Sequence, residues 1–125
     1  MKSVKVLVFG TFDGIHDGHR FFLKEAKKLG DMLVVCVAQD SVVEKLKGRM
    51  PKSSTVERAK QISELPEVDS TLLGDVDLGN WSSIKTAEPD IVVAGFDQIK
   101  LREALENILP DFHFVFKIIQ IDKME

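Results

Sequence analysis

Residues 10–19 read GTFDGIHDGH and lie between two segments of contrasting pattern. The segment before them, residues 4–9 (VKVLVF), is short, rich in valine and followed by a glycine, which is typical of a buried parallel strand. In the segment after them, apolar residues recur at helical spacing with charged residues between, which predicts a helix over 18–29. The stretch therefore connects a strand to a helix, as in the first unit of an α/β fold.

Three glycines give this stretch the properties of an anion-binding loop. Gly10, Gly14 and Gly18 permit tight backbone geometry and let a ligand approach the main chain closely. The first turn of the following helix offers unpaired N–H groups and the positive end of the helix dipole. A phosphate group is therefore an expected ligand of the loop.

Strands and helices alternate over the rest of the chain. This pattern predicts one domain over residues 1–125 with a Rossmann-like, doubly wound fold, in which a five-stranded parallel sheet carries helices on both faces. Ligands of such folds bind at the carboxyl ends of the strands where the strand order reverses, so the end of the first strand marks the expected site. The expected strands are 4–9, 32–38, 68–73, 91–95 and 113–119, and the expected helices are 18–29, 40–46, 54–64, 80–87 and 99–108.

Two histidines, His16 and His19, stand three residues apart at the helix entrance, so both rings can face the same small volume. Imidazole N–H groups can donate hydrogen bonds to phosphoryl oxygens and stabilise a charge-rich transition state. The alternatives are ordinary packed or surface histidines, or half of a zinc site. The zinc alternative is weak, because His113 falls in a distant predicted strand and Cys36 lies among valines, where a thiol packs as a small apolar group.

Composition limits the classes of partner. The net charge of −3 gives no overall attraction to nucleic acid, and the chain has neither an apolar span of membrane length nor a signal-peptide pattern. A single cysteine cannot form an internal disulfide. We therefore expect a cytoplasmic protein with small-molecule substrates and no nucleic-acid or membrane partner. The apolar helix faces are compatible with a homodimer, although the same faces are needed to cover the sheet.

Polar and charged residues follow two other predicted strands. Lys45, Lys47 and Arg58 belong to a basic run that is either a solvated surface or a phosphate-binding loop. Asp97 and Gln98 follow the fourth predicted strand, where they either end the strand as turn formers or hold a base or ribose. Each set is expected at the edge of the sheet that carries the glycine-rich loop.

The loop resembles the signature of one family. It is neither a Walker loop nor a G-x-G-x-x-G fingerprint. Gly-Thr-Phe-Asp followed by His-x-Gly-His is similar to the motif of the cytidylyltransferase-like nucleotidyltransferases, which transfer a nucleoside monophosphate from a nucleoside triphosphate. With the segments VAQD (37–40), KLKGR (45–49), ER (57–58) and GFDQ (95–98), the chain up to residue 121 resembles archaeal-type FAD synthases, which are FMN adenylyltransferases.

This resemblance implies ATP and FMN as substrates, and it implies roles for individual residues. Thr11, Phe12, His16 and His19 would contact ATP, Asp97 would contact its nucleoside, and Lys45, Lys47 and Arg58 would contact phosphates. On this resemblance, catalysis is expected of His16, His19, Lys45 and Arg58, and nucleotide binding is expected of Gly10, Thr11, Phe12, Gly18, Lys47, Asp97 and Gln98. Mg²⁺ is expected with the triphosphate, and Asp13 is either its ligand or a brace for the loop. Phe21, Phe22 and Trp81 are interpreted as core residues rather than as flavin contacts.

Two features depart from the family pattern. Phe96 stands where a tyrosine is commoner, and the Ser-Thr-Thr-type run expected after the fifth strand is not found in residues 121–125 (IDKME). Two alternatives therefore stay open beside FAD synthesis. One is a cytidylyltransferase acting on glycerol 3-phosphate or another phosphorylated acceptor, although that enzyme typically has Asp-Trp in place of Asp97-Gln98. The other is a nucleotide-binding protein with weak catalysis.

Overall fold

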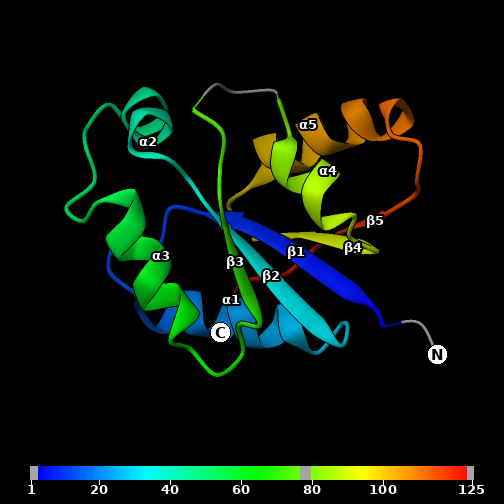
Figure 1. Ribbon diagram of the computed structural model, residues 1–125, viewed down its shortest axis with the longest axis horizontal. Coiled ribbons are helices and arrows are strands. Elements are labelled where there is room, and N and C mark those ends of the chain that lie inside the picture. Colours follow the sequence, from blue (N-terminus) through cyan, green and yellow to red (C-terminus); the bar gives the residue numbers. More distant parts are fainter. Residues whose placement is uncertain (1–2, 77–79, 124–125) are drawn as a thin grey trace.

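The computed structural model describes residues 3–76 and 80–123, which form a five-stranded parallel sheet with helices on both faces (Figure 1). The strands lie in the order β3-β2-β1-β4-β5. The strands are β1 (Lys5–Gly10), β2 (Met32–Val37), β3 (Ser70–Leu73), β4 (Ile91–Ala94) and β5 (Lys117–Gln120). The helices are α1 (Asp17–Lys27), α2 (Asp40–Lys47), α3 (Thr55–Ser63), α4 (Ser82–Ala87) and α5 (Ile99–Ile108), followed by the 3₁₀ turn η1 (Leu109–Asp111).

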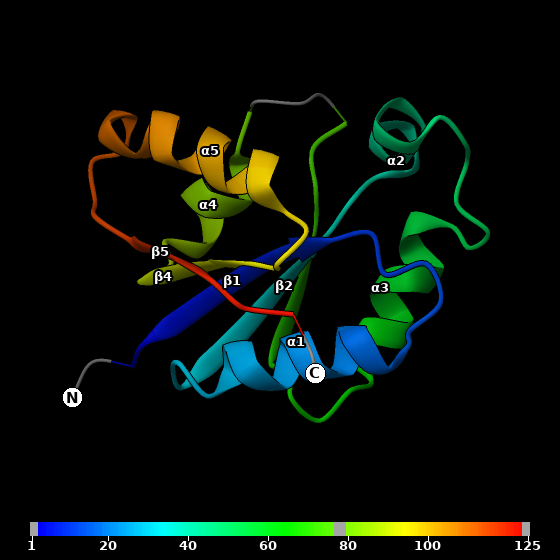
Figure 2. The same cartoon turned by 180° about the vertical axis from the view of Figure 1, so that it is seen from behind.

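The central strand β1 is buried on both sides, which explains its unbroken apolar sequence. Val6 and Val8 pack in one core cluster with residues of α1 and α3, whereas Leu7 packs in a second cluster with residues of α4 and α5. Figure 2 shows the same division, with α1 and α3 on one side of the sheet and α4 and α5 on the other. The predicted doubly wound fold is thus confirmed.

The strand order reverses between β1 and β4. The chain runs outward from β1 through β2 to β3, and then returns to the other side of β1 to form β4 and β5. Ligands of doubly wound folds bind at the carboxyl ends of the strands where the order reverses, which here are the ends of β1 and β4. Gly10 ends β1, so the glycine-rich loop begins at this point.

The main error of the sequence-based prediction concerns the fifth strand. It covers Lys117–Gln120 and not 113–119, because the phenylalanines before it pack on one another instead of pairing with β4. The rings of Phe112 and Phe116 meet edge to face with their centroids 5.6 Å apart. His113 is therefore not in a strand, and its side chain is 85% exposed.

Two other expectations can be compared with the described residues. Cys36 is buried in β2, and burial raises the pKa of its thiol to about 11, as expected for a thiol that packs as an apolar group. In residues 3–76 and 80–123 no helix has the length and apolar character needed to span a membrane.

Candidate nucleotide site

His16 and His19 cap the first turn of α1 reciprocally. His16 is the N-cap residue, and its Nδ1 accepts from the backbone N–H of His19 at 3.3 Å. In return, the backbone N–H of His16 donates to Nδ1 of His19, also at 3.3 Å. The two rings stack with their centroids 3.7 Å apart and their planes 17° from parallel. The arrangement is a capping box built from imidazoles.

The caps determine where the ring protons are. Because both Nδ1 atoms accept hydrogen bonds, each neutral imidazole carries its proton on Nε2, on the far side of the ring from the capped backbone. The pKa of His19 is held below its usual value, first by burial of the ring and next by the neighbouring His16. The Nε2 atom of each ring is thus directed away from the backbone that the pair caps.

We expect the cap to make stability depend on pH. The unfolded-state pKa of His19 is about 6.5 and its folded-state pKa is lower, so the contribution of the cap is complete above about pH 6.5. It is lost as the pH falls through the folded pKa, because a proton on Nδ1 would face the backbone N–H of His16. The free energy of unfolding, measured in urea, should fall by up to about 1 kcal/mol between about pH 7.5 and about pH 5.

The control is His19→Gln, since glutamine at this position of a capping box accepts the same hydrogen bond without titrating. The variant should show a smaller change over the same pH interval. An equal change in both proteins would contradict the assigned role of His19.

The side chain of Phe12 packs against the histidine pair. Its ring is buried, with 3% exposure, and meets the ring of His19 edge to face at 5.3 Å. The backbone of Phe12 has a φ of 54°, which is rare for a bulky residue, and a Cβ atom on Gly10 would lie 2.5 Å from the Phe12 ring. Gly10 is thus required by close packing. The Phe12 ring thus packs inside the protein against His19, and the expected contact of Phe12 with ATP stays a prediction.

Asp13 braces the loop. Its carboxylate oxygens accept from the backbone N–H groups of Lys52 at 2.8 Å and Ser53 at 3.1 Å. The hydrogen bond from Lys52 is the largest cause that holds the pKa of Asp13 below its ordinary value. These bonds are those of a brace, and the role of Asp13 as a metal ligand stays a prediction. Across residues 3–76 and 80–123, no group of three or more His, Cys, Asp or Glu side chains could hold a metal ion.

Arg58 is fully buried and joins the glycine-rich loop to the segment that follows α2. Its guanidinium donates to the carbonyl oxygens of Thr11 at 2.8 Å and Ser53 at 2.9 Å, and to the carboxylate of Asp40 at 2.7 Å. This contact holds the pKa of Asp40 below its usual range. All three groups that accept from this guanidinium belong to the protein, so we interpret Arg58 as a positioning residue. Its expected contact with a phosphate stays a prediction.

The two lysines of α2 are exposed and do not face the same way. The positive charge of Lys47 helps to lower the pKa of His19, and the negative charge of Asp97 acts to raise it. Both charges therefore lie near His19. Lys45 is two residues away on the helix, and residues at that spacing do not share a face. The charge of Lys47 is thus related to His19, and the expected phosphate contact of Lys45 stays a prediction.

Gln98 ties together the strands at the reversal point. Its Oε1 accepts from the N–H of Gly95 at 2.8 Å, and its Nε2 donates to the carbonyl of Phe9 at 2.9 Å. The amide thus bridges the ends of β4 and β1, in agreement with the expected strand-ending role, and its contact with a base or ribose stays a prediction. Asp97, beside it, is exposed.

Sequence reasoning missed Gln120 and the role of His16 as a cap. Gln120 ends β5 opposite Ala94, and its Nε2 donates to the carbonyl of Gly95 at 3.1 Å. A polar residue at the end of a predicted strand was the available signal. Gly18 leaves room for the His16 ring, since a Cβ there would lie 3.0 Å from the ring.

The sheet, its reversal point and the histidine pair define a nucleotide-binding α/β protein. The cytidylyltransferase-like family profile matches residues 7–125. A FAD synthase from Thermococcus sibiricus is 40% identical over 120 residues, covering 96% of this chain and 81% of that protein. A FAD synthase from Aciduliprofundum boonei is 43% identical over 120 residues, which cover 96% of this chain and 79% of that protein. The lipopolysaccharide core biosynthesis protein from Thermoplasma volcanium, a crystal structure, has a TM-score of 0.84 at 35% identity, covering 99% of this chain and 100% of that one.

The chain belongs to the cytidylyltransferase-like family and is a nucleotidyltransferase.

Proposed function

We propose that the protein transfers AMP from MgATP to FMN, giving FAD and pyrophosphate. The proposal is supported by the likeness to FAD synthases at 40% identity over 96% of the chain. The observation that carries it is the pair of imidazoles whose Nε2–H donors stand at the start of α1, with the charge of Lys47 in their surroundings. These are the groups needed to hold a triphosphate at the end of β1.

The first turn of α1 adds two backbone donors. Within the described part of the chain, the N–H groups of Asp17 and Gly18 have no protein partner, whereas that of His19 is used by the cap. Free N–H groups at a helix start bind phosphate oxygens and are favoured by the helix dipole. Together with the two imidazoles, they form a cluster of hydrogen-bond donors for a polyanion.

The chemistry needs charge stabilisation rather than a base. An oxygen of the FMN phosphate forms a bond to the α-phosphorus of ATP, and the bond from that phosphorus to the bridging oxygen breaks, so that pyrophosphate leaves. The attacking oxygen is already ionised, so no general base is required. His16, His19 and Lys47 would stabilise the charge on the transferred and leaving phosphates, an effect that is strong when donors are held in place beforehand.

We further propose that Mg²⁺ enters as part of the substrate MgATP. Magnesium usually keeps several waters and binds nucleotide phosphates with few protein ligands. This agrees with Asp13, whose two oxygens are already used by backbone N–H groups.

The test measures FAD and pyrophosphate with each combination of ATP or CTP and FMN or glycerol 3-phosphate. We expect both products with ATP and FMN alone. Pyrophosphate with CTP and glycerol 3-phosphate would instead assign a cytidylyltransferase. ATP binding without release of pyrophosphate for any acceptor would assign a nucleotide-binding protein with weak catalysis, and either result would overturn the proposal.

A further inference from the structure

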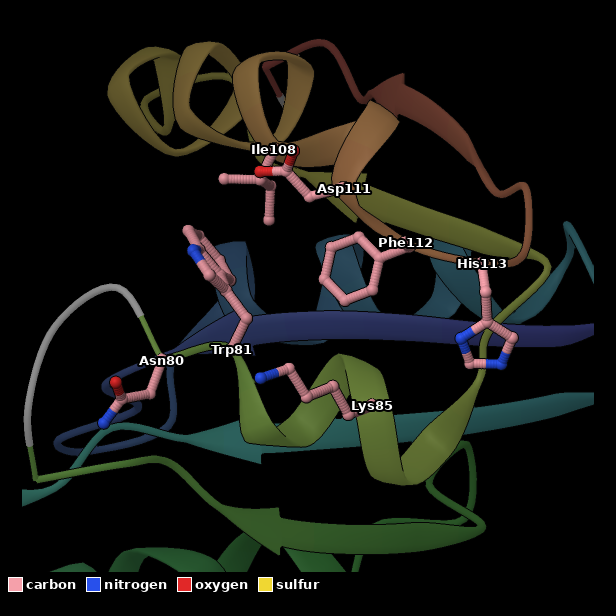
Figure 3. Close-up of a pocket in the computed structure, with 7 residues that line it drawn as sticks. All are labelled: Asn80, Trp81, Lys85, Ile108, Asp111, Phe112 and His113. Carbon is pink, nitrogen blue, oxygen red and sulfur yellow. The ribbon is translucent and has the colours of Figure 1, made fainter.

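A cavity of about 460 Å³ lies away from the histidine pair, between α4 and the end of α5 with η1 (Figure 3). It is on the face of the sheet that α4 and α5 cover. The nucleotidyl transfer described above uses none of its lining residues. The lining residues that could contact a ligand through a ring or a polar group include Asn80, Trp81, Lys85, Asp111 and Phe112.

Trp81 connects this cavity to the nucleotide site. Its ring meets the ring of Phe9 edge to face, with centroids 5.9 Å apart, and Phe9 is the residue before Gly10. The carbonyl of Phe9 also accepts from Gln98 at the reversal point. One end of the cavity is therefore next to the carboxyl end of β1, where the phosphates are proposed to bind.

The backbone of Trp81 is in the left-handed region, at φ 56° and ψ 35°. This conformation is rare for a bulky residue, and such strain is found most often at functional sites. It is held in place by the first turn of α4, where the carbonyl of Trp81 accepts from Ile84 and the N–H of Ser82 donates to Asp75. Trp81 packs against the core cluster on this face of the sheet, as the sequence suggested, but it is only half-buried and also lines the cavity.

The lining of the cavity combines aromatic rings with hydrogen-bond donors and hydrogen-bond acceptors. In Figure 3 the rings of Trp81 and Phe112 border the same space, into which the amino group of Lys85 extends. Lys85 can donate, Asp111 can accept and Asn80 can do both. In the described ranges neither Lys85 nor Asp111 forms an ion pair, so their polar atoms are available.

A planar heteroaromatic ring with carbonyl oxygens and an imide N–H matches these groups. The rings could stack on it, Lys85 could donate to a carbonyl oxygen, and Asp111 could accept from the imide. The volume of the cavity lies within the range of about 300–1,000 Å³ that is usual for small-molecule sites.

We propose that this cavity binds the isoalloxazine ring of the flavin acceptor against Trp81, with its phosphate directed past Phe9 toward the histidine pair. This inference rests on the proposed function, because it gives a place to the acceptor of that reaction. It assigns acceptor specificity to Trp81 and Lys85, and not to the glycine-rich loop.

The chain has one tryptophan and no tyrosine, so fluorescence can test the contact directly. Riboflavin and FMN are titrated into the protein while flavin emission is recorded, because a tryptophan in contact with the ring quenches it. We expect strong quenching of both ligands. Trp81→Phe should restore most of the emission of the bound flavin. Lys85→Met should weaken riboflavin binding about tenfold, the loss expected for one hydrogen bond from a charged donor.

The matched control is Lys60→Met, which removes the same charge from an exposed position of α3 on the opposite side of the sheet. It should leave flavin affinity unchanged. Riboflavin affinity unchanged in Lys85→Met, or flavin emission unaffected by Trp81→Phe, would overturn the inference. Lys85 is exposed, so its variant tests the site even if Trp81→Phe does not fold.

Different results would contradict the proposed reaction and the proposed flavin cavity. If wild-type protein makes FAD while the KM for FMN is unchanged in both variants, the assigned cavity is wrong and the function stands. If riboflavin is quenched and the variants weaken its binding, but no FAD is formed, the cavity is a flavin site and the proposed reaction is wrong.

Discussion

His16→Asn is expected to lower the turnover number of nucleotidyl transfer about 100- to 1,000-fold, the usual loss when one prearranged donor is removed from a charged transition state. Asparagine is a strong N-cap residue, so it can still accept from the backbone N–H of His19. It does not place an N–H where Nε2 of the imidazole lies. Steady-state rates of pyrophosphate release, with ATP and the acceptor saturating, measure the effect.

The same substitution separates catalysis from helix capping. The free energy of unfolding should change by less than about 0.5 kcal/mol, because the cap is retained. Ser54→Asn is the matched control, since Ser54 caps α3 by accepting from the N–H of Glu57. It should alter neither stability nor turnover. Wild-type turnover in both His16→Asn and His19→Gln would contradict the role of the imidazole pair.

Arg58→Met is expected to destabilise the protein by roughly 2–4 kcal/mol. The substitution leaves the carbonyl oxygens of Thr11 and Ser53 without their donor, and it removes the partner of Asp40. The lower part of the range allows for Asp40, which is one-third exposed and can be solvated by water. The midpoint of urea unfolding measures the loss.

The companion variant Arg58→Lys keeps the charge but offers a compact ammonium in place of the planar fork, so it should recover only part of the stability. A direct phosphate contact would behave differently. It would raise the KM for ATP in both variants and leave the unfolding midpoint unchanged, and that result would contradict the positioning role.

Patterns along the chain were sufficient to predict the fold. The apolar run before Gly10 and the helical spacing after it depend on neighbouring residues, and the structure contains that strand and helix within a few residues of the expected bounds. The fifth strand was misplaced because alternating phenylalanines look the same whether they line a strand or pack on one another.

The roles of polar residues were harder to predict, since they depend on distant partners. Asp13 meets Lys52 across 39 positions, and Arg58 meets Thr11 across 47. The sequence places a carboxylate in a loop and a guanidinium in a helix near the expected site, but it does not show that backbone groups distant in the chain engage them. The histidine pair was easier to identify, because the residues that define its geometry lie within one turn of helix.

The bonds of Asp13 and Arg58 join two segments that are far apart in the chain. The loop that leads to the imidazoles is thus tied to the segment before α3 by protein groups alone. A triphosphate can dock without first ordering this half of the protein, so we expect its association to be rapid and its bound geometry to vary little from one turnover to the next.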